Sequence, residues 1–135
     1  MNWTLEVVIV PVSDVEQAKK FYQNQLGFNV DHDTKINESM RIVQLTPLGS
    51  GCSIVIGTGI SKMLPGSLKG LQLVVNDIRK AHTQLVSNSV DVSEITRMGE
   101  NQPDFDGDEL DNIGFVFFSD PDGNQWAVQQ ISSRL

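Results

Sequence analysis

The chain carries the same short pattern twice, at positions 63 residues apart if counted from Asp14 to Asp77. Residues 12–15 (VSDV) and 75–78 (VNDI) each close an apolar run and open a helical pattern. Each run predicts a β-strand, and each Asp stands where a helix N-cap is preferred. A repeat of this length predicts two copies of one strand–helix–strands unit. Because one such unit cannot bury its sheet alone, we expect the copies to pair, with a ligand cleft between the curved sheets.

The first copy is predicted to contain a strand, a helix and three further strands. Residues 5–10 (LEVVIV) are rich in β-branched side chains and indicate a strand buried on both faces. In the helix that follows, Asp14 is the expected N-cap, Gln17 its capping-box partner, and Gly27 the residue that ends the helix. The three strands are expected at residues 28–33, 41–46 and 52–56.

The second copy repeats this order. A strand at residues 71–75 precedes a helix from Asp77 to about Ser87, and another strand is expected at residues 90–95. An acidic loop, residues 99–111, leads to a hairpin of residues 113–118 and 125–131. Its turn, residues 120–123 (DPDG), has the Pro and Gly positions of a type I turn.

The segment between the copies lacks periodicity and is rich in Gly, Pro and Ser, which is typical of a linker. We therefore expect one domain over residues 1–135, made of a module at 1–57, a linker at 58–69 and a module at 70–135. The predicted fold class is α+β, with two β-α-β-β-β modules pairing into an open curved sheet or barrel around a central cleft.

Charge and cysteine content limit the partners and the compartment. The net charge of −7 argues against a nucleic-acid groove, which needs clustered Lys and Arg. No apolar stretch approaches the roughly 20 residues that span a membrane. The first residues lead directly into a strand, so we expect no secretory signal. Cys52 is the single cysteine, which fits a reducing environment, and we expect a cytoplasmic protein.

Three motifs of the chain are the twin Val-x-Asp motifs, the aromatic pair Phe21-Tyr22 followed by residues 26–28 (LGF), and residues 119–124 (SDPDGN). With these motifs in this order, the chain resembles the vicinal oxygen chelate superfamily. This superfamily includes glyoxalase I, bleomycin-resistance proteins and extradiol dioxygenases. The resemblance covers almost the whole chain. It implies two β-α-β-β-β modules forming an open barrel around a cleft, usually within a homodimer.

The resemblance also implies where a metal would be held. Metal-using members take His, Gln or Glu ligands from four strands, and counting from the motifs places those positions at Val7, Val55, Gly70 and Ala127. None of these side chains offers a donor atom to a divalent cation. We therefore expect no metal and no cofactor, and neither glyoxalase nor dioxygenase activity of the metal-dependent kind.

Several residues are candidates for contact with a small molecule in the cleft. Gln44 is a polar residue in an otherwise apolar strand, and Gln129 shares a strand face with Ala127 by the period of two. Trp126 has the opposite parity, so it either stacks on a planar ligand or packs in the core. The predicted ligand-binding set is Val7, His32, Gln44, Val55, Phe105, Trp126, Ala127 and Gln129.

Three functions remain open at this point. The first is a small-molecule binding protein of the glyoxalase/bleomycin-resistance type without the metal, taking a planar or cationic ligand. The second is a metal-independent enzyme of the lyase or isomerase kind, using His32, Glu6 or the acidic loop as acid–base groups. The third is a structural module that uses the barrel only for dimerisation. The residues do not decide whether modules pair within one chain or between chains, nor whether the acidic loop closes over the cleft.

Overall fold

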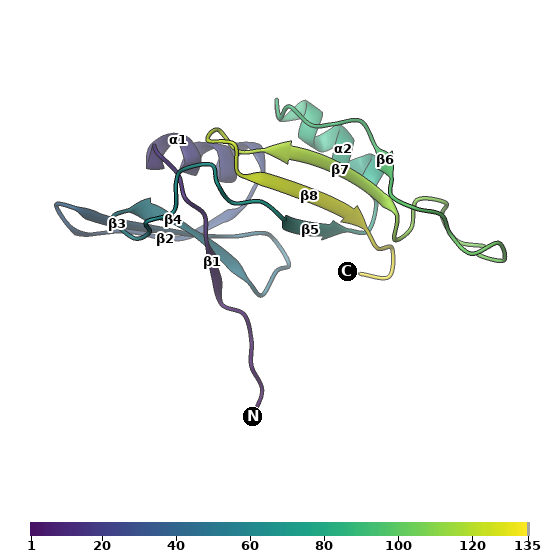
Figure 1. Cartoon of the computed structure of the whole chain (residues 1–135), viewed down its shortest axis with the longest axis horizontal. Helices are drawn as coiled ribbons and strands as arrows, with labels where there is room; N and C mark the ends of the chain where they lie inside the picture. Colours follow the sequence, from purple (N-terminus) through teal and green to yellow (C-terminus); the bar gives the residue numbers. More distant parts are fainter. Residues whose placement is uncertain (135) are drawn as a thin grey trace. The chain divides into compact units, whose positions relative to one another are not determined.

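The computed structural model describes residues 1–134, and over this range the chain forms two four-stranded mixed sheets and two α-helices (Figure 1). The elements of the first copy are β1 (Val7–Ile9), α1 (Val15–Lys20), the π-helical turn η1 (Phe21–Gln25), β2 (Asn29–Asn37), β3 (Met40–Thr46) and β4 (Ser53–Thr58). Those of the second copy are β5 (Leu71–Val75), α2 (Ile78–Ser87), β6 (Thr96–Arg97), β7 (Gly114–Ser119) and β8 (Gln125–Gln130).

The two sheets have the same topology, which confirms the repeat and the α+β class. Sheet 1 has the order β1-β4-β3-β2 and sheet 2 the order β5-β8-β7-β6. In each sheet the first strand of the copy pairs parallel to the last, and the other neighbours are antiparallel. Neither sheet closes into a barrel. Among the helices described, none is long and apolar enough to cross a membrane.

The chain divides into two compact units. Unit 1 comprises Met1–Leu68 together with Asp120–Asn124, and unit 2 comprises Lys69–Ser119 together with the chain from Gln125 onward. Unit 1 thus contains sheet 1, and unit 2 contains sheet 2.

Both predicted helix caps form. The Asp14 carboxylate accepts a hydrogen bond from the Gln17 backbone N–H at 3.1 Å, and Asp77 accepts from the backbone N–H groups of Arg79 and Lys80, each at 3.1 Å. These bonds satisfy N–H groups that have no partner within the helix. The first helix departs from the prediction in its second half, where it widens into the η1 π-turn before Gly27 (φ 75°) ends it.

Two strand predictions were wrong, one in its extent and one in its existence. Residues 5–10 were expected to be buried on both faces, but only Val7–Ile9 is a strand, and it is half-buried because β1 lies at the edge of sheet 1. The strand expected at residues 90–95 does not form. There Ser93 lies beside β7, where its backbone N–H donates to the Phe117 carbonyl and its hydroxyl accepts from the Phe117 N–H, both at 2.9 Å. One of the two hydrogen bonds is thus made by a side chain and not by a paired strand.

The turn that joins β7 to β8 belongs to the core of unit 1 and lies beside α1 (Figure 1). The Gly123 N–H donates to the Asp120 carbonyl at 3.0 Å, which confirms the predicted turn. Asp120 is 5% exposed and accepts a hydrogen bond from the Tyr22 hydroxyl at 2.7 Å. Asn124 is fully buried and donates to the Pro11 carbonyl at 2.8 Å. The SDPDGN motif therefore holds unit 1 together.

Candidate ligand-binding faces

Four of the predicted ligand-binding residues share one face of sheet 1. Direct cross-strand pairing places Val55 opposite Gln44 and Gln44 opposite His32, so these side chains point to the same side. Val7 pairs with Ser53, two residues before Val55 on β4, and points to that side as well. We call this side the open face of sheet 1, because α1 packs on the other side.

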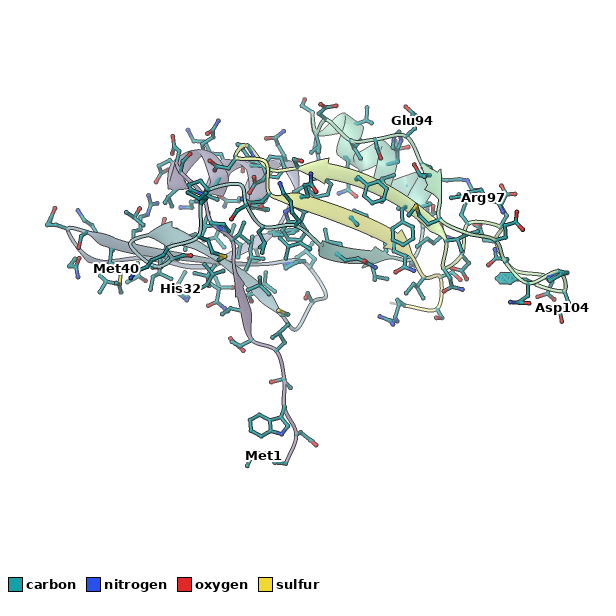
Figure 2. All side chains as sticks on the ribbon, in the orientation of Figure 1. Met1, His32, Met40, Glu94, Arg97 and Asp104 are labelled. Carbon is teal, nitrogen blue, oxygen red and sulfur yellow. The ribbon has the colours of Figure 1, made fainter. Side chains whose placement is uncertain are left out.

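Hydrogen-bonding groups lie along this open face. His32 Nε2 and Gln44 Oε1 are 3.3 Å apart, and His32 lies on the exposed strand β2 (Figure 2). Next to them, the Thr46 hydroxyl donates to the Asp31 carboxylate and lies 2.6 Å from the Ser53 hydroxyl. The Thr46 bond, with a second from the Asn29 amide, keeps the pKa of Asp31 below its ordinary value. Asp31 therefore presents a negative charge at neutral pH next to Thr46 on this face.

A charge network ties the opposite side of sheet 1 to α1. Arg41 on β3 makes a bidentate bond to Asp33 at 2.9 and 2.7 Å and contacts Glu16 of α1 at 2.5 Å. Lys19 of α1 reaches the same Asp33 at 2.8 Å. The Arg41 guanidinium, followed by the Lys19 ammonium, holds the pKa of Asp33 well below its usual range. This network positions the sheet on the helix.

We expect Asp33→Asn to lower the free energy of unfolding by about 2 kcal/mol at pH 7, since it removes a charged partner of Arg41. The folded pKa of Asp33 is depressed, so its stabilisation is present above the unfolded pKa of about 3.9 and is lost as the pH falls toward the folded value. Urea unfolding of both proteins from pH 7 to pH 2.5 should show their difference shrinking below about pH 4.

Glu38→Gln is the matched control, because the Glu38–Lys35 pair is exposed and should contribute less than about 0.5 kcal/mol. A difference between wild type and Asp33→Asn that stayed constant down to pH 2.5 would contradict the assignment.

Trp126 points to the side of sheet 2 that α2 covers, and it lies in the core. Trp126 is 3% exposed and stacks on Phe118, with ring centroids 6.0 Å apart and planes 6° apart. On the same side the Gln130 side-chain oxygen accepts from the Ile78 backbone N–H at 3.0 Å and so helps to cap α2. Trp126 is thus shielded from solvent, and we leave it out of the candidate ligand-binding surface.

The other side of sheet 2 is open and carries an aromatic pair. Phe115 and Phe117 stack with centroids 6.1 Å apart and planes 7° apart, and Phe117 is 39% exposed. Register places Ala127 opposite Phe117 and Gln129 opposite Phe115, so both predicted residues share this face. Gln72 joins them from β5 and donates to Gln129 at 2.7 Å. We call these five residues the open face of sheet 2.

Phe115, Phe117 and Gln72 were missed in the sequence, although a signal was present. Counting residues outward along both strands from the turn at residues 120–123 pairs Phe117 with Ala127. Because side chains alternate between the two sides of a strand, Phe115 and Gln129 then lie on the same side as this pair. The parity of Trp126, opposite to Ala127, follows from the same count.

Phe105 lies in the acidic loop of unit 2. Its ring covers the backbone of Gly107, within the loop itself. At the base of the loop, Arg79 binds Asp108 at 3.0 Å, while Figure 2 shows Asp104 at the far tip. The pKa of Asp108 is held below its ordinary value, first by the Leu110 backbone N–H and also by Arg79. The loop is thus anchored at one end.

The four positions implied for a metal lie on strands or just before one. Val7 and Val55 lie on β1 and β4 of unit 1, whereas Gly70 directly precedes β5 and Ala127 lies on β8 of unit 2. These residues supply no side-chain donor, so they do not fit a divalent cation. Throughout residues 1–134, no three His, Cys, Asp or Glu side chains form a metal-binding group.

The acid–base candidates of the enzyme hypothesis also have defined places. Glu6 is exposed just before β1, and His32 is exposed on β2 at the far edge of the same sheet. A hollow of about 220 Å³ in unit 1 lies between residues 9–13 and 57–65, and the predicted site residues do not line it.

Comparison with known proteins identifies the family. Residues 4–128 match the model of the Glyoxalase/Bleomycin resistance protein/Dioxygenase superfamily. The chain belongs to this superfamily. This confirms the resemblance seen in the motifs. No curated protein sequence matches the chain significantly.

Solved structures agree with this assignment. TnmS3, an antibiotic binding protein from Streptomyces sp. CB03234, is 32% identical with a TM-score of 0.75, over 97% of this chain and 98% of that one. A glyoxalase/bleomycin resistance protein from the same strain is 32% identical with a TM-score of 0.72, over 94% and 100%. A superfamily member from Sphaerobacter thermophilus DSM 20745 is 27% identical with a TM-score of 0.76, over 96% and 98%.

Proposed function

We propose that this superfamily member binds a planar organic small molecule, with a cationic group where the ligand carries one, and does so without a metal and without transforming the ligand. The observation that carries the proposal is the Phe115–Phe117 pair on the open face of sheet 2. A half-exposed, parallel aromatic pair offers a flat apolar surface, and the neighbouring Gln72 and Gln129 amides offer hydrogen bonds at its edge.

Within unit 1, the open face of sheet 1 is a second and separate candidate surface, and it suits a cationic ligand. Asp31 presents a carboxylate that stays ionised, and His32 and Gln44 supply further polar contacts beside Val55. A cationic group gains from such a carboxylate where the face is partly shielded from water. The antibiotic-binding relative at 32% identity supports a ligand of antibiotic type.

The metal-free part of the proposal depends on donor chemistry. Val7, Val55 and Ala127 carry hydrocarbon side chains, and Gly70 has none. Polarisation of a bound substrate by a metal, as the superfamily's glyoxalases and dioxygenases require, has no ligand set at these positions. Binding is the function that aromatic, amide and apolar side chains can perform by themselves.

A thermal-shift and calorimetric titration tests the proposal. Daunorubicin serves as a planar cationic probe, emodin as a planar neutral one, and Zn²⁺ and Mn²⁺ with an EDTA control as the metal arm. A planar probe at about 100 times its Kd should add about 2.7 kcal/mol to the stability of the folded protein, and the metals should add nothing. Phe117→Ala tests the open face of sheet 2 and should weaken binding of emodin about tenfold or more.

Two variants sharpen the result. Asp31→Asn tests the separate surface on sheet 1 and should weaken binding of daunorubicin but not of emodin, whereas Val86→Ala, at an exposed apolar site on α2, should change neither. Because the pKa of Asp31 is lowered, the preference for the cation should be the same at pH 5 as at pH 7. A saturable metal shift abolished by EDTA would overturn the metal-free proposal, and planar probes that bind equally to Phe117→Ala would overturn the site.

A further inference from the structure

Two glutamines on the open face of sheet 2 are joined to a backbone carbonyl in one line of hydrogen bonds. The Gln129 side-chain amide donates to the carbonyl oxygen of Asn112 at 2.8 Å, and the Gln72 amide donates to the Gln129 side-chain oxygen at 2.7 Å. All three residues belong to unit 2: Gln129 lies on β8, Gln72 on β5, and Asn112 shortly before β7. We call these three residues the amide chain.

The first member of the amide chain is held in place by the backbone. The Asn112 N–H donates to the Gln130 carbonyl at 2.8 Å, and the N–H of the next residue, Ile113, donates to the Leu110 carbonyl at 3.2 Å. The φ angle of Asn112 is 68°, in the left-handed region that Asn adopts more readily than most other residues. Its carbonyl oxygen is therefore a fixed group, and it can only accept a hydrogen bond.

This one acceptor decides the orientation of both glutamine amides. An amide has an oxygen that accepts and an NH₂ group that donates. Gln129 must present its NH₂ group to the Asn112 carbonyl, so its oxygen faces Gln72, and Gln72 must present its own NH₂ group to that oxygen. Turning either amide over would bring two oxygen atoms into contact. The Gln72 oxygen is thus left at the end of the amide chain, and within residues 1–134 no group donates to it.

The Gln72 oxygen lies in the same row of the sheet as the exposed ring of Phe117. β8 lies between β5 and β7 (Figure 1), and register places Ala127 beside both Gln72 and Phe117. Because neighbouring strands are about 4.8 Å apart, the strands of Gln72 and Phe117 are roughly 10 Å apart. The Gln72 nitrogen is turned toward Gln129, two residues beyond Ala127, so its oxygen is on the side of the amide away from Gln129.

We propose that the amide chain makes this face selective for planar aromatic ligands that carry a hydrogen-bond donor at the rim, such as a phenol hydroxyl or an aromatic N–H. The inference rests on the proposed function and specifies which planar ligands the face prefers. The ligand lies over the short side chain of Ala127, with Phe117 at one end, and its donor bonds to the Gln72 oxygen at the other. Gln129 is the positioning residue, because it keeps that oxygen from exchanging places with the NH₂ group.

Stacking by itself does not provide this selectivity. A phenol and its methyl ether have the same flat ring system, so the Phe117 ring offers both of them a similar apolar contact. The two differ in one donor, which only an acceptor such as the Gln72 oxygen recognises. One net hydrogen bond corresponds to about tenfold in affinity.

Two probes that differ in this donor test the proposal by calorimetric titration of the full chain. Emodin carries one phenol that is not bonded internally to its quinone oxygens, and physcion is the same anthraquinone with that phenol converted to a methyl ether. We expect the wild type to bind emodin about tenfold more tightly than physcion. Gln72→Leu should weaken the binding of emodin about tenfold and leave that of physcion unchanged, which removes the preference.

Gln129→Leu tests the positioning role separately. It leaves Gln72 in place but frees its amide to turn over, so the preference for emodin should fall roughly threefold or more while physcion binds as before. A merely structural role of Gln129 would weaken both probes by the same factor. Gln84→Leu is the matched control, because it makes the same change at an exposed position on α2 in unit 2, and it should leave the preference unchanged.

The outcomes separate this inference from the proposed function. Equal binding of emodin and physcion to the wild type would overturn the inference and leave the planar-ligand function standing. A preference that survives Gln72→Leu would overturn it too, because the discrimination would then come from the shape of the methyl ether. A preference that survives Gln129→Leu would overturn the positioning role. If neither probe bound the wild type, the proposed function would fail, and this inference with it.

Discussion

Asp120→Ala is expected to lower the free energy of unfolding by about 3–5 kcal/mol, a large fraction of the stability of a domain of this size. The Asp120 carboxylate is buried and accepts four hydrogen bonds. They come from the Tyr22 hydroxyl at 2.7 Å, the Asn124 side-chain amide at 2.8 Å, and the backbone N–H groups of Asp122 at 3.0 Å and Asn124 at 2.9 Å. Alanine removes every acceptor at once. The Tyr22 hydroxyl and the two Asn124 N–H donors are then left in a buried site, each at a cost of about 1–3 kcal/mol.

The same turn provides the matched control. Asp122 accepts from the Ser13 N–H at 3.1 Å and hydroxyl at 2.6 Å, but at an exposed site, so Asp122→Ala should cost only about 1 kcal/mol. Urea unfolding monitored by far-ultraviolet circular dichroism measures both. If Asp120→Ala and Asp122→Ala were equally mild, the turn would not be a core element of unit 1.

Trp126→Ala is expected to destabilise the protein by about 3–5 kcal/mol, whereas Phe117→Ala should cost about 1 kcal/mol. The two residues lie on adjacent strands and on opposite sides of sheet 2. Trp126 is 3% exposed and stacked on Phe118, so its removal leaves a large cavity under α2. Phe117 is 39% exposed and loses much less buried surface.

The ligand assay should reverse this ranking. Phe117→Ala should weaken the binding of emodin about tenfold or more, while Trp126→Ala, measured below its unfolding temperature, should bind with nearly wild-type affinity. Chemical unfolding and calorimetric titration of both variants provide the comparison. A stable Trp126→Ala protein that had lost ligand binding would restore Trp126 to the binding surface and contradict the core assignment.

Features that depend on neighbouring residues were predictable. Asp14 and Asp77 cap their helices through residues two or three positions away, so the signal is complete within one turn of chain. The turn at residues 120–123 closes within four residues for the same reason. Both open faces follow from the period of two along strands whose hairpins could be counted, which is why Gln44, Val55, Ala127 and Gln129 were placed correctly on strands.

Features that depend on a strand's position in its sheet were not predictable. The LEVVIV run has the composition of a central strand, yet β1 has one neighbour, because the topology puts the first strand of each copy at an edge. Residues 90–95 have strand-forming side chains, but the Ser93 hydroxyl accepts the hydrogen bond of the Phe117 backbone N–H. This bond takes the place of a backbone–backbone bond between paired strands. Composition reports the propensity of a segment, while pairing depends on what lies beside it.

The sequence by itself determined the repeat, the α+β class, the helix caps, and the lack of donor side chains at Val7, Val55, Gly70 and Ala127, because each depends on local order or on residue chemistry. The tertiary structure decided what the SDPDGN motif does. Its contacts join residues 98 to 113 positions apart, as between Tyr22 and Asp120 or between Pro11 and Asn124. Only folding brings such residues together, and burial then turns a polar turn into a core element.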